Sequence, residues 1–160
     1  MLDATSWLNG CIGYTQSDEI TIIVKPTEKA HDYMFGGKCS KLNSVIASRV
    51  TACFNKHINS AELAYFDCRV WGVPTAIEAS NVLLWRVLDA ERNAVSAAYH
   101  HMFGHKAMQG KSCKEMLNEI GLTWETLPER QKLGMLSKGS SRAFRQADLQ
   151  DRLTYLGDTI

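Results

Sequence analysis

The 160-residue sequence lacks an apolar run long enough to span a bilayer, and it has no signal peptide. Its five cysteines form no Cys-x-x-Cys pair and its five histidines form no His-Glu-x-x-His motif, so the common zinc patterns are absent. An odd, scattered set of cysteines is typical of free thiols in a reducing compartment, so we expect a cytoplasmic protein without a membrane partner. The net charge of +1 excludes a protein that is basic throughout, so any nucleic-acid surface must be local.

A predicted β-hairpin near the N-terminus carries two adjacent carboxylates. Short apolar runs at residues 11–12 and 20–24 flank the polar residues 13–19 (GYTQSDE), a pattern typical of two strands joined by a turn. Asp18 and Glu19 then lie at the hairpin tip or just past it. Because adjacent residues on a strand point to opposite faces, we expect one carboxylate to face a metal ion while the other braces the turn. The alternative is a solvated acidic turn.

A helix is predicted over about residues 39–57, after a loop with two glycines, because apolar residues recur there at spacings of three and four. Lys38 and Lys41 lie at its start, where the macrodipole disfavours cations. They indicate either a bound anion or simple solvation. A strand is predicted over residues 63–73, where Asp67 and Arg69 share a face and either pair with each other or hold a ligand.

A long helix is predicted over about residues 76–103. Its expected buried side carries Val82, Leu83, Trp85, Leu88, Val95, Ala98 and Met102. Arg86, Asp89 and Asn93 recur at steps of three and four and form one polar stripe, which is either a solvated face or a binding surface. Shorter helices are predicted at residues 2–9, at 112–120 with Ser112 as N-cap, and at about 129–136.

The order of these elements predicts the fold class. Helix, strand, strand, helix, strand and long helix become the βαββαβ arrangement when one strand is added in front. We therefore expect an α+β fold, with a ferredoxin-like antiparallel sheet that has helices on one face, plus a long helix and C-terminal helical additions. The domain spans residues 1–136, and residues 137–160 form a polar tail that we expect to be loosely held.

Six stretches, taken together and in order, resemble the tRNA-His guanylyltransferase family, particularly its bacterial, archaeal and phage-type members. They are residues 13–19, 38–42, 65–70, 84–94, 105–112 and 127–132, and the similarity covers about residues 1–136. The resemblance implies a polymerase-palm fold and an enzyme that adds GTP-derived nucleotides to the 5′ end of tRNA or tRNA-like RNA in the 3′–5′ direction. The reaction would be tRNA-His guanylylation or 5′-end repair. The resemblance also implies two Mg²⁺ ions, GTP and ATP as substrates, and a homo-oligomer (dimer or tetramer).

The resemblance assigns roles to individual residues. Asp18 is similar to a metal-binding carboxylate of the family, and Glu19 is its neighbour in the same catalytic motif. The residues that match expected nucleotide-binding positions are Ser17, Lys38, Lys41, Arg69, Asp89 and Asn93. Lys38 stands where many relatives carry Arg, so a bidentate contact would become a point charge. Glu91 stands where eukaryotic members carry His, which favours the repair-type branch.

The family's other metal-binding Asp belongs to an Asp-Gly-Arg motif on a first strand that this sequence does not contain. Three explanations stay open: a fragment of a longer enzyme, one half of a split protein, or a degenerate relative. The last of these gives the alternative function, a catalytically incomplete relative that acts as a nucleotide-binding, RNA-binding or structural protein. A sheet without that strand would expose an unpaired edge, which invites a partner chain.

Overall fold

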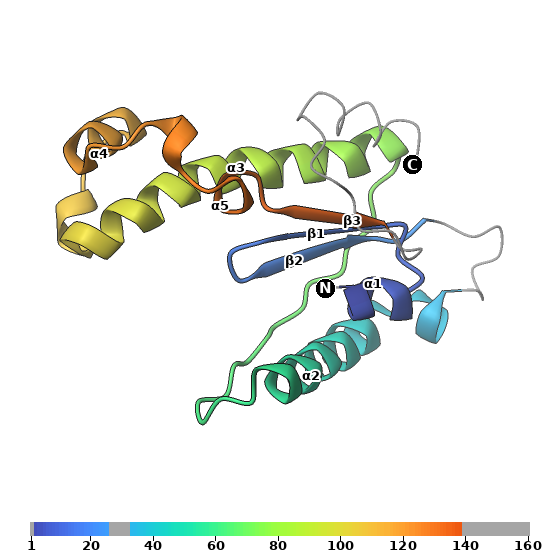
Figure 1. Cartoon of the computed structure of the whole chain (residues 1–160). Coiled ribbons are helices and arrows are strands. Elements are labelled where there is room, and N and C mark those ends of the chain that lie inside the picture. Colours follow the sequence, from blue (N-terminus) through green and yellow to red (C-terminus); the bar gives the residue numbers. More distant parts are fainter. Residues whose placement is uncertain (1, 26–32, 139–160) are drawn as a thin grey trace. The chain divides into compact units, whose positions relative to one another are not determined.

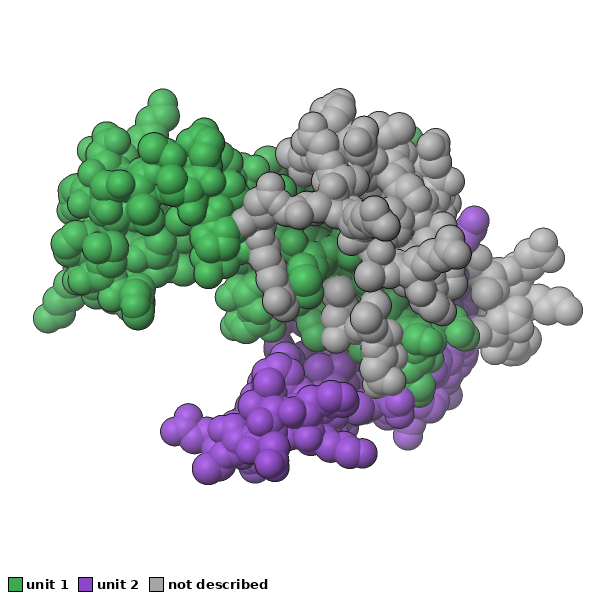
Figure 2. All heavy atoms as spheres, in the orientation of Figure 1, with its two compact units in different colours: residues 1–23, 75–160 green, residues 24–74 purple. Residues whose placement is uncertain are grey.

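The computed structural model describes residues 2–25 and 33–138 (Figure 1). The elements, in chain order, are α1 (Leu2–Trp7), β1 (Ile12–Gln16), β2 (Glu19–Ile23), the 3₁₀ helix η2 (Met34–Gly37), α2 (Cys39–Ile58), α3 (Ala76–Phe103), η3 (His105–Met108), α4 (Cys113–Ile120), η4 (Trp124–Thr126), α5 (Glu129–Leu133) and β3 (Met135–Lys138). This mixture of one antiparallel sheet and helices confirms the predicted α+β class. The chain divides into two compact units, residues 1–23 with 75–160 and residues 24–74, which Figure 2 distinguishes by colour. Among the described helices, none is both long and apolar enough to cross a membrane.

The first unit is built on an antiparallel sheet with strand order β2-β1-β3. The predicted hairpin is present, with Ile12 opposite Ile23 and Gln16 opposite Glu19. Ser17 and Asp18 form its two-residue turn, and Ser17 takes a left-handed φ of 53°. The Thr15 hydroxyl donates to the Glu19 carbonyl at 2.8 Å, which fixes the start of β2 beside the turn.

The two faces of this sheet are covered by different helices. On one face Ile12 and Tyr14 pack with Leu83 and Val87 of α3, and all four side chains are buried. Ile22 points to the opposite face because side chains alternate along a strand. There it lies against the end of the α1 segment, where a Cβ on Gly10 would approach the Ile22 Cγ2 to 2.6 Å.

The helix α3 carries a second core in its C-terminal half, formed by Val95 and Tyr99 with Met116 of α4 and Leu127. The helix begins at an N-cap, where the Thr75 hydroxyl accepts from the Glu78 N–H at 3.2 Å. Its buried residues are Ala79, Leu83, Val87, Ala90, Ala94, Val95 and Tyr99. The predicted buried side was therefore wrong for Trp85, Leu88 and Met102, whose exposed fractions are 61%, 51% and 58%.

The segment predicted as one helix at about residues 129–136 contains a helix and a strand. The helix α5 ends at Leu133, and Gly134 takes a φ of 65° before β3 begins. In β3, Met135 and Leu136 pair with β1, as do residues 137 and 138. The strand therefore crosses the boundary predicted between domain and tail, and the rest of that tail lies outside the described residues.

The second unit joins α2 to an extended segment at residues 63–73. The Asn55 side chain donates to the Ala64 carbonyl and accepts from the Ala64 N–H, both at 2.9 Å. The Phe66 N–H donates to the Thr51 hydroxyl at 3.1 Å, and the Phe54 and Phe66 rings meet edge to face at 5.2 Å. Within the described ranges this segment pairs with no strand, so the predicted strand is wrong. Exposed and half-buried residues nevertheless alternate over residues 63–70.

Candidate functional site

The polar stripe of α3 meets the tip of the hairpin. The Arg86 Nη2 lies 2.5 Å from the Glu19 Oε2 and 2.8 Å from the Asp89 Oδ2. Asn93, one turn further along α3, donates from its Nδ2 to the same Asp89 oxygen at 3.2 Å. We call Glu19, Arg86, Asp89 and Asn93 the hairpin junction. One guanidinium thus holds a carboxylate from each of two elements that are far apart in the sequence.

The local sequence explains why these groups meet. Glu19, Thr21 and Ile23 share the face of β2 that packs on α3, because side chains alternate along the strand. Arg86, Asp89 and Asn93 share a helix face because they are three and four residues apart. The Arg86 Cζ lies 4.5 Å from the Trp85 ring centroid, and only 16% of the Arg86 side chain is exposed. This burial and stacking hold the guanidinium in place.

Asp18 has different surroundings from Glu19. It is exposed in the turn, and among the residues that the structure describes its carboxylate forms no hydrogen bond or ion pair. The neighbouring Ser17 is also exposed, and its left-handed backbone points the chain from β1 into β2. Of the two predicted catalytic carboxylates, Glu19 is therefore engaged by Arg86, while Asp18 is accessible to solvent.

The donor atoms at the hairpin tip can be compared with the needs of Mg²⁺. The described residues contain no cluster of three His, Cys, Asp or Glu side chains, so they form no protein cage for a metal. Mg²⁺ commonly binds through one or two carboxylates plus waters and substrate phosphates. An accessible Asp18 fits that mode for one ion.

The start of α2 is the positive end of its helix macrodipole, and no acidic side chain of the first turn compensates it. Lys38 is the N-cap, it makes no side-chain capping bond, and the first turn contains no acidic residue. The Lys41 Nζ lies 5.8 Å from the Phe35 ring centroid, and both lysines are exposed. Phe35 and Gly36 both take left-handed backbone conformations in the turn that leads into the helix. Free backbone N–H groups and two ammonium groups suit an anion such as a phosphate.

Arg69, the remaining predicted nucleotide-binding residue, lies on the extended segment of the second unit. Its Nη2 lies 3.2 Å from the Asp67 Oδ2, and more than four fifths of both side chains is exposed, so the pair contributes little to stability. Burial and the charge of Asp67 raise the pKa of the intervening Cys68 thiol, which disfavours a reactive thiolate. All five cysteines are free thiols, as predicted.

The predicted site residues are thus divided between the two units. Glu19, Asp89 and Asn93 meet at the hairpin junction, with Ser17 and Asp18 in the adjoining turn. Lys38, Lys41 and Arg69 belong to residues 24–74. Arg86 was placed on the polar stripe but was assigned no role at the site, and its spacing of three from Asp89 was the available signal.

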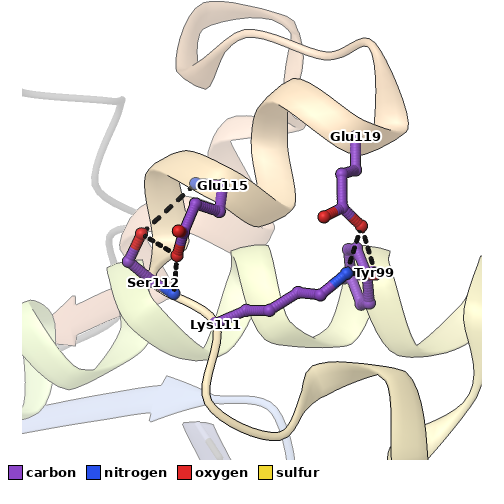
Figure 3. Close-up of polar contacts among 5 residues, drawn as sticks. All are labelled: Tyr99, Lys111, Ser112, Glu115 and Glu119. Atoms are coloured by element: carbon purple, nitrogen blue, oxygen red, sulfur yellow. Dashed lines mark hydrogen bonds and ion pairs between the residues drawn. The ribbon is translucent and has the colours of Figure 1, made fainter.

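A second polar network, not predicted as a site, joins the far half of α3 to α4 (Figure 3). The Tyr99 hydroxyl donates to the Glu119 Oε2 at 2.5 Å and accepts from the Lys111 Nζ at 2.7 Å, and Lys111 and Glu119 form an ion pair. The hydrogen bond from Lys111 lowers the pKa of Glu119, and the same contact raises the pKa of Lys111. Ser112 and Glu115 form a capping box at the start of α4, which the Ser-x-x-Glu spacing indicates. The network stabilises the junction of the two helices.

Comparisons with known proteins support the family resemblance seen in the sequence. Residues 4–74 match the tRNA-His guanylyltransferase family. An uncharacterized protein of Acanthamoeba polyphaga mimivirus is 31% identical over 169 residues, covering 86% of this chain and 58% of that protein. A bacterial tRNA(His) guanylyltransferase-like protein solved in complex with ATP aligns with a TM-score of 0.76 and 27% identity, covering 99% of this chain and 80% of that chain.

Two further solved structures extend the comparison. A bacterial tRNA(His) guanylyltransferase-like protein in complex with GTP has a TM-score of 0.65 and 30% identity, covering 84% of this chain and 59% of that one. The tRNA(His) guanylyltransferase of Saccharomyces cerevisiae, at 20% identity and a TM-score of 0.69, covers 94% of this chain and 76% of that one and shares the fold. The architecture is thus that of guanylyltransferase-like nucleotidyltransferases. This chain resembles the tRNA-His guanylyltransferase family, with the family match confined to residues 4–74, and it spans 58% of the length of its mimivirus relative.

Proposed function

We propose that this chain forms the nucleotidyltransferase core of an enzyme that adds GTP-derived nucleotides to the 5′ end of tRNA or tRNA-like RNA in the 3′–5′ direction. The observation that supports it best is the hairpin junction, which leaves Asp18 accessible while Arg86 fixes Glu19. The matched relatives solved with ATP and with GTP support nucleotides as substrates. Glu91 favours repair of truncated 5′ ends over strict tRNA-His guanylylation.

Some residues of this chain would bind phosphate groups, and others would position the charged side chains of the site. Asp18 would hold Mg²⁺ together with the substrate's phosphate oxygens. When bound, Mg²⁺ neutralises phosphate charge and aligns the reacting oxygens. Glu19 is tied to Arg86 and so positions the turn that carries Asp18. In the first step the 5′-phosphate of the RNA would attack the α-phosphate of ATP or GTP, which releases pyrophosphate. The 3′-hydroxyl of the incoming GTP would then attack the activated 5′-phosphate, which releases the nucleoside monophosphate.

The nucleotide phosphates would bind at the start of α2. Lys38 and Lys41 supply two positive charges beside unpaired backbone N–H groups, and no acidic residue in the first turn opposes an anion. Arg69 supplies a further cation once a phosphate displaces the weak Asp67 contact. Within the first unit, Ser17, Asp89 and Asn93 offer hydroxyl, carboxylate and amide groups for nucleotide contacts.

The deciding assay is GTP-dependent extension of a tRNA that lacks its first 5′ nucleotide, with Mg²⁺ present. Asp18→Asn keeps the shape of the side chain and removes its charge, so transfer should fall on the order of a hundredfold or more while the folded structure persists. Glu78→Gln removes the same charge from an exposed residue in the first turn of α3, in the same unit and about two helical turns before Arg86, and should retain activity. Equal activity in both variants would remove Asp18 from the mechanism.

A nucleotide- or RNA-binding protein without turnover is the second candidate. The ion pairs of Glu19 and Asp89 with Arg86 favour this candidate, because they leave Asp18 as the accessible carboxylate of the site among the described residues. This candidate predicts that ATP and GTP bind with the same affinity with or without Mg²⁺ and that no pyrophosphate is released. Metal-dependent pyrophosphate release from the intact chain excludes it.

A further inference from the structure

The C-terminal end of α3 and the η3 turn after it carry a cluster of basic side chains. The last turn of α3 contains His100 and His101, η3 begins with His105 and Lys106, and all four residues are exposed. Between the two elements Gly104 takes a φ of 76°, and the chain turns so that the His100 and His105 ring centroids lie 6.2 Å apart. We call His100, His101, His105 and Lys106 the α3 tip.

The sequence around the tip contains positive charge without negative charge. Residues 92–114 include no Asp or Glu, although the whole chain carries a net charge of only +1. Among the described side chains of the first unit, the exposed lysines and arginines all come from this stretch: Arg92, Lys106 and Lys114. The two acidic residues of α4 are already engaged, Glu115 with the Ser112 cap and Glu119 with Lys111. A local basic surface of this kind suits an anionic partner.

The tip lies on the same face of α3 as the hairpin junction. Steps of three and four residues form one row along the helix, which consists of Arg86, Asp89, Asn93, Ala97 and His100. Asn93, Ala97 and His100 are exposed. With a rise of about 1.5 Å per residue, His100 lies about 16 Å from Asp89 along the helix axis. The row therefore leads from the candidate site to the tip along one side of the helix.

We propose that the α3 tip binds the phosphate backbone of the RNA substrate, several nucleotides away from the 5′ end that reacts beside Asp18. This inference rests on the proposed function, because that function places the 5′ end at the hairpin turn. Ammonium and imidazole N–H groups donate to phosphate oxygens without reading the base sequence. The helix macrodipole by itself favours His100 and His101 at the end of α3, but it does not account for Lys106, which lies beyond that helix.

The first test measures the affinity for a labelled tRNA that lacks its first 5′ nucleotide, by fluorescence anisotropy at several salt concentrations without ATP or GTP. Lys106→Ala should weaken binding roughly threefold to tenfold and should reduce the slope of log affinity against log salt by about 1, because one phosphate contact is lost. Lys106→Arg keeps the charge and should bind like the wild type. Lys114→Ala is the matched control and should leave the slope unchanged, because α4 packs on α3 through Val95 and Tyr99, outside the row.

The second test locates the contact along the RNA. RNA hairpins with stems of increasing length are titrated with the wild type and with the double variant His101→Ala/Lys106→Ala. The double variant should bind the shortest hairpins like the wild type, and it should lose affinity once the stem extends about 16 Å from the 5′ end. In the transfer assay it should raise KM for tRNA and leave kcat unchanged, because these two side chains contact no reacting group.

Two results would overturn the proposal. One is a wild-type chain that binds no tRNA, or whose affinity and salt slope change no more with Lys106→Ala than with Lys114→Ala. The other is an effect of the double variant that is equal for every hairpin length, because the contact would then lie elsewhere on the RNA. Nucleotide transfer that persists while the tip variants bind tRNA normally counts against this proposal alone. Tip-dependent RNA binding without any transfer counts against the proposed function alone.

Discussion

Replacing Arg86 with Met tests whether the hairpin junction holds the sheet to α3. The substitution keeps an unbranched apolar side chain on the helix but removes the charge between Glu19 and Asp89. Two charge-assisted contacts are lost, at 2.5 and 2.8 Å, each contributing about 1 kcal/mol after discounting for the exposure of Glu19. Loss of the contact with the Trp85 ring adds about 0.5 kcal/mol. We therefore expect Arg86→Met to destabilise the protein by about 2.5 kcal/mol.

Thermal unfolding followed by circular dichroism measures this effect. For a chain of this size, about 2.5 kcal/mol corresponds to a fall in Tm of about 5–10 °C. Arg92→Met is the matched control, because Arg92 is an exposed residue of the same helix and should change stability by no more than about 0.5 kcal/mol. High salt should narrow the gap between the wild type and Arg86→Met, since Glu19 is half exposed.

A double-mutant cycle with Glu19→Gln then isolates the contact itself. The destabilisations of Arg86→Met and Glu19→Gln should fall short of additivity by about 1 kcal/mol, because either change breaks the same pair. Additive effects, or an Arg86→Met variant as stable as Arg92→Met, would contradict the assignment of Arg86 as the residue that fixes the hairpin tip.

Three further variants test the rest of the first unit. Hydrogen bonds from Lys111 and Tyr99 lower the pKa of Glu119. Its contribution to stability is therefore present above the ordinary glutamate pKa of about 4.3 and is lost as pH falls through the folded-state pKa. The Tm difference between the wild type and Glu119→Gln should therefore shrink on acidification. Ser112→Ala removes the N-cap of α4 and should cost about 1 kcal/mol in a urea titration, and no change would argue against the capping box. Gly134→Ala places a Cβ 2.6 Å from the backbone of β1 at a φ of 65° and should cost at least about 1 kcal/mol, whereas Gly72→Ala, in open space, should be neutral or slightly stabilising.

Local signals in the sequence were sufficient for the hairpin, α2, α3 and the Ser112 cap, because turn residues, periodicity and capping act over a few residues. These local signals were not sufficient where tertiary packing determines which residues are buried. Hydrophobicity placed Trp85 and Leu88 in the core, but α3 instead buries Ala79, Ala90 and Ala94, whose small side chains allow close packing. A helix with apolar residues on several faces does not reveal which face is covered.

The candidate site shows the same division between local and tertiary information. The polar stripe and the adjacent carboxylates could be predicted from spacing, but the ion pair between Glu19 and Arg86 joins residues whose separation in the sequence carries no signal. The third strand was missed for a related reason. Met135 and Leu136 form a strand only because β1 offers them a pairing edge, and Gly134 provides the left-handed turn that ends α5.

The pairing of β1 with β3 has a consequence for how the chain folds. The Tyr14 hydroxyl donates to the Leu133 carbonyl at 3.2 Å across 119 positions of sequence, whereas Asn55 reaches Ala64 across nine. Closing a long loop costs more entropy than closing a short one, and distant contacts slow folding. The hairpin and the α2 segment can therefore form early during synthesis. The three-stranded sheet can be completed only after nearly all the described chain has left the ribosome.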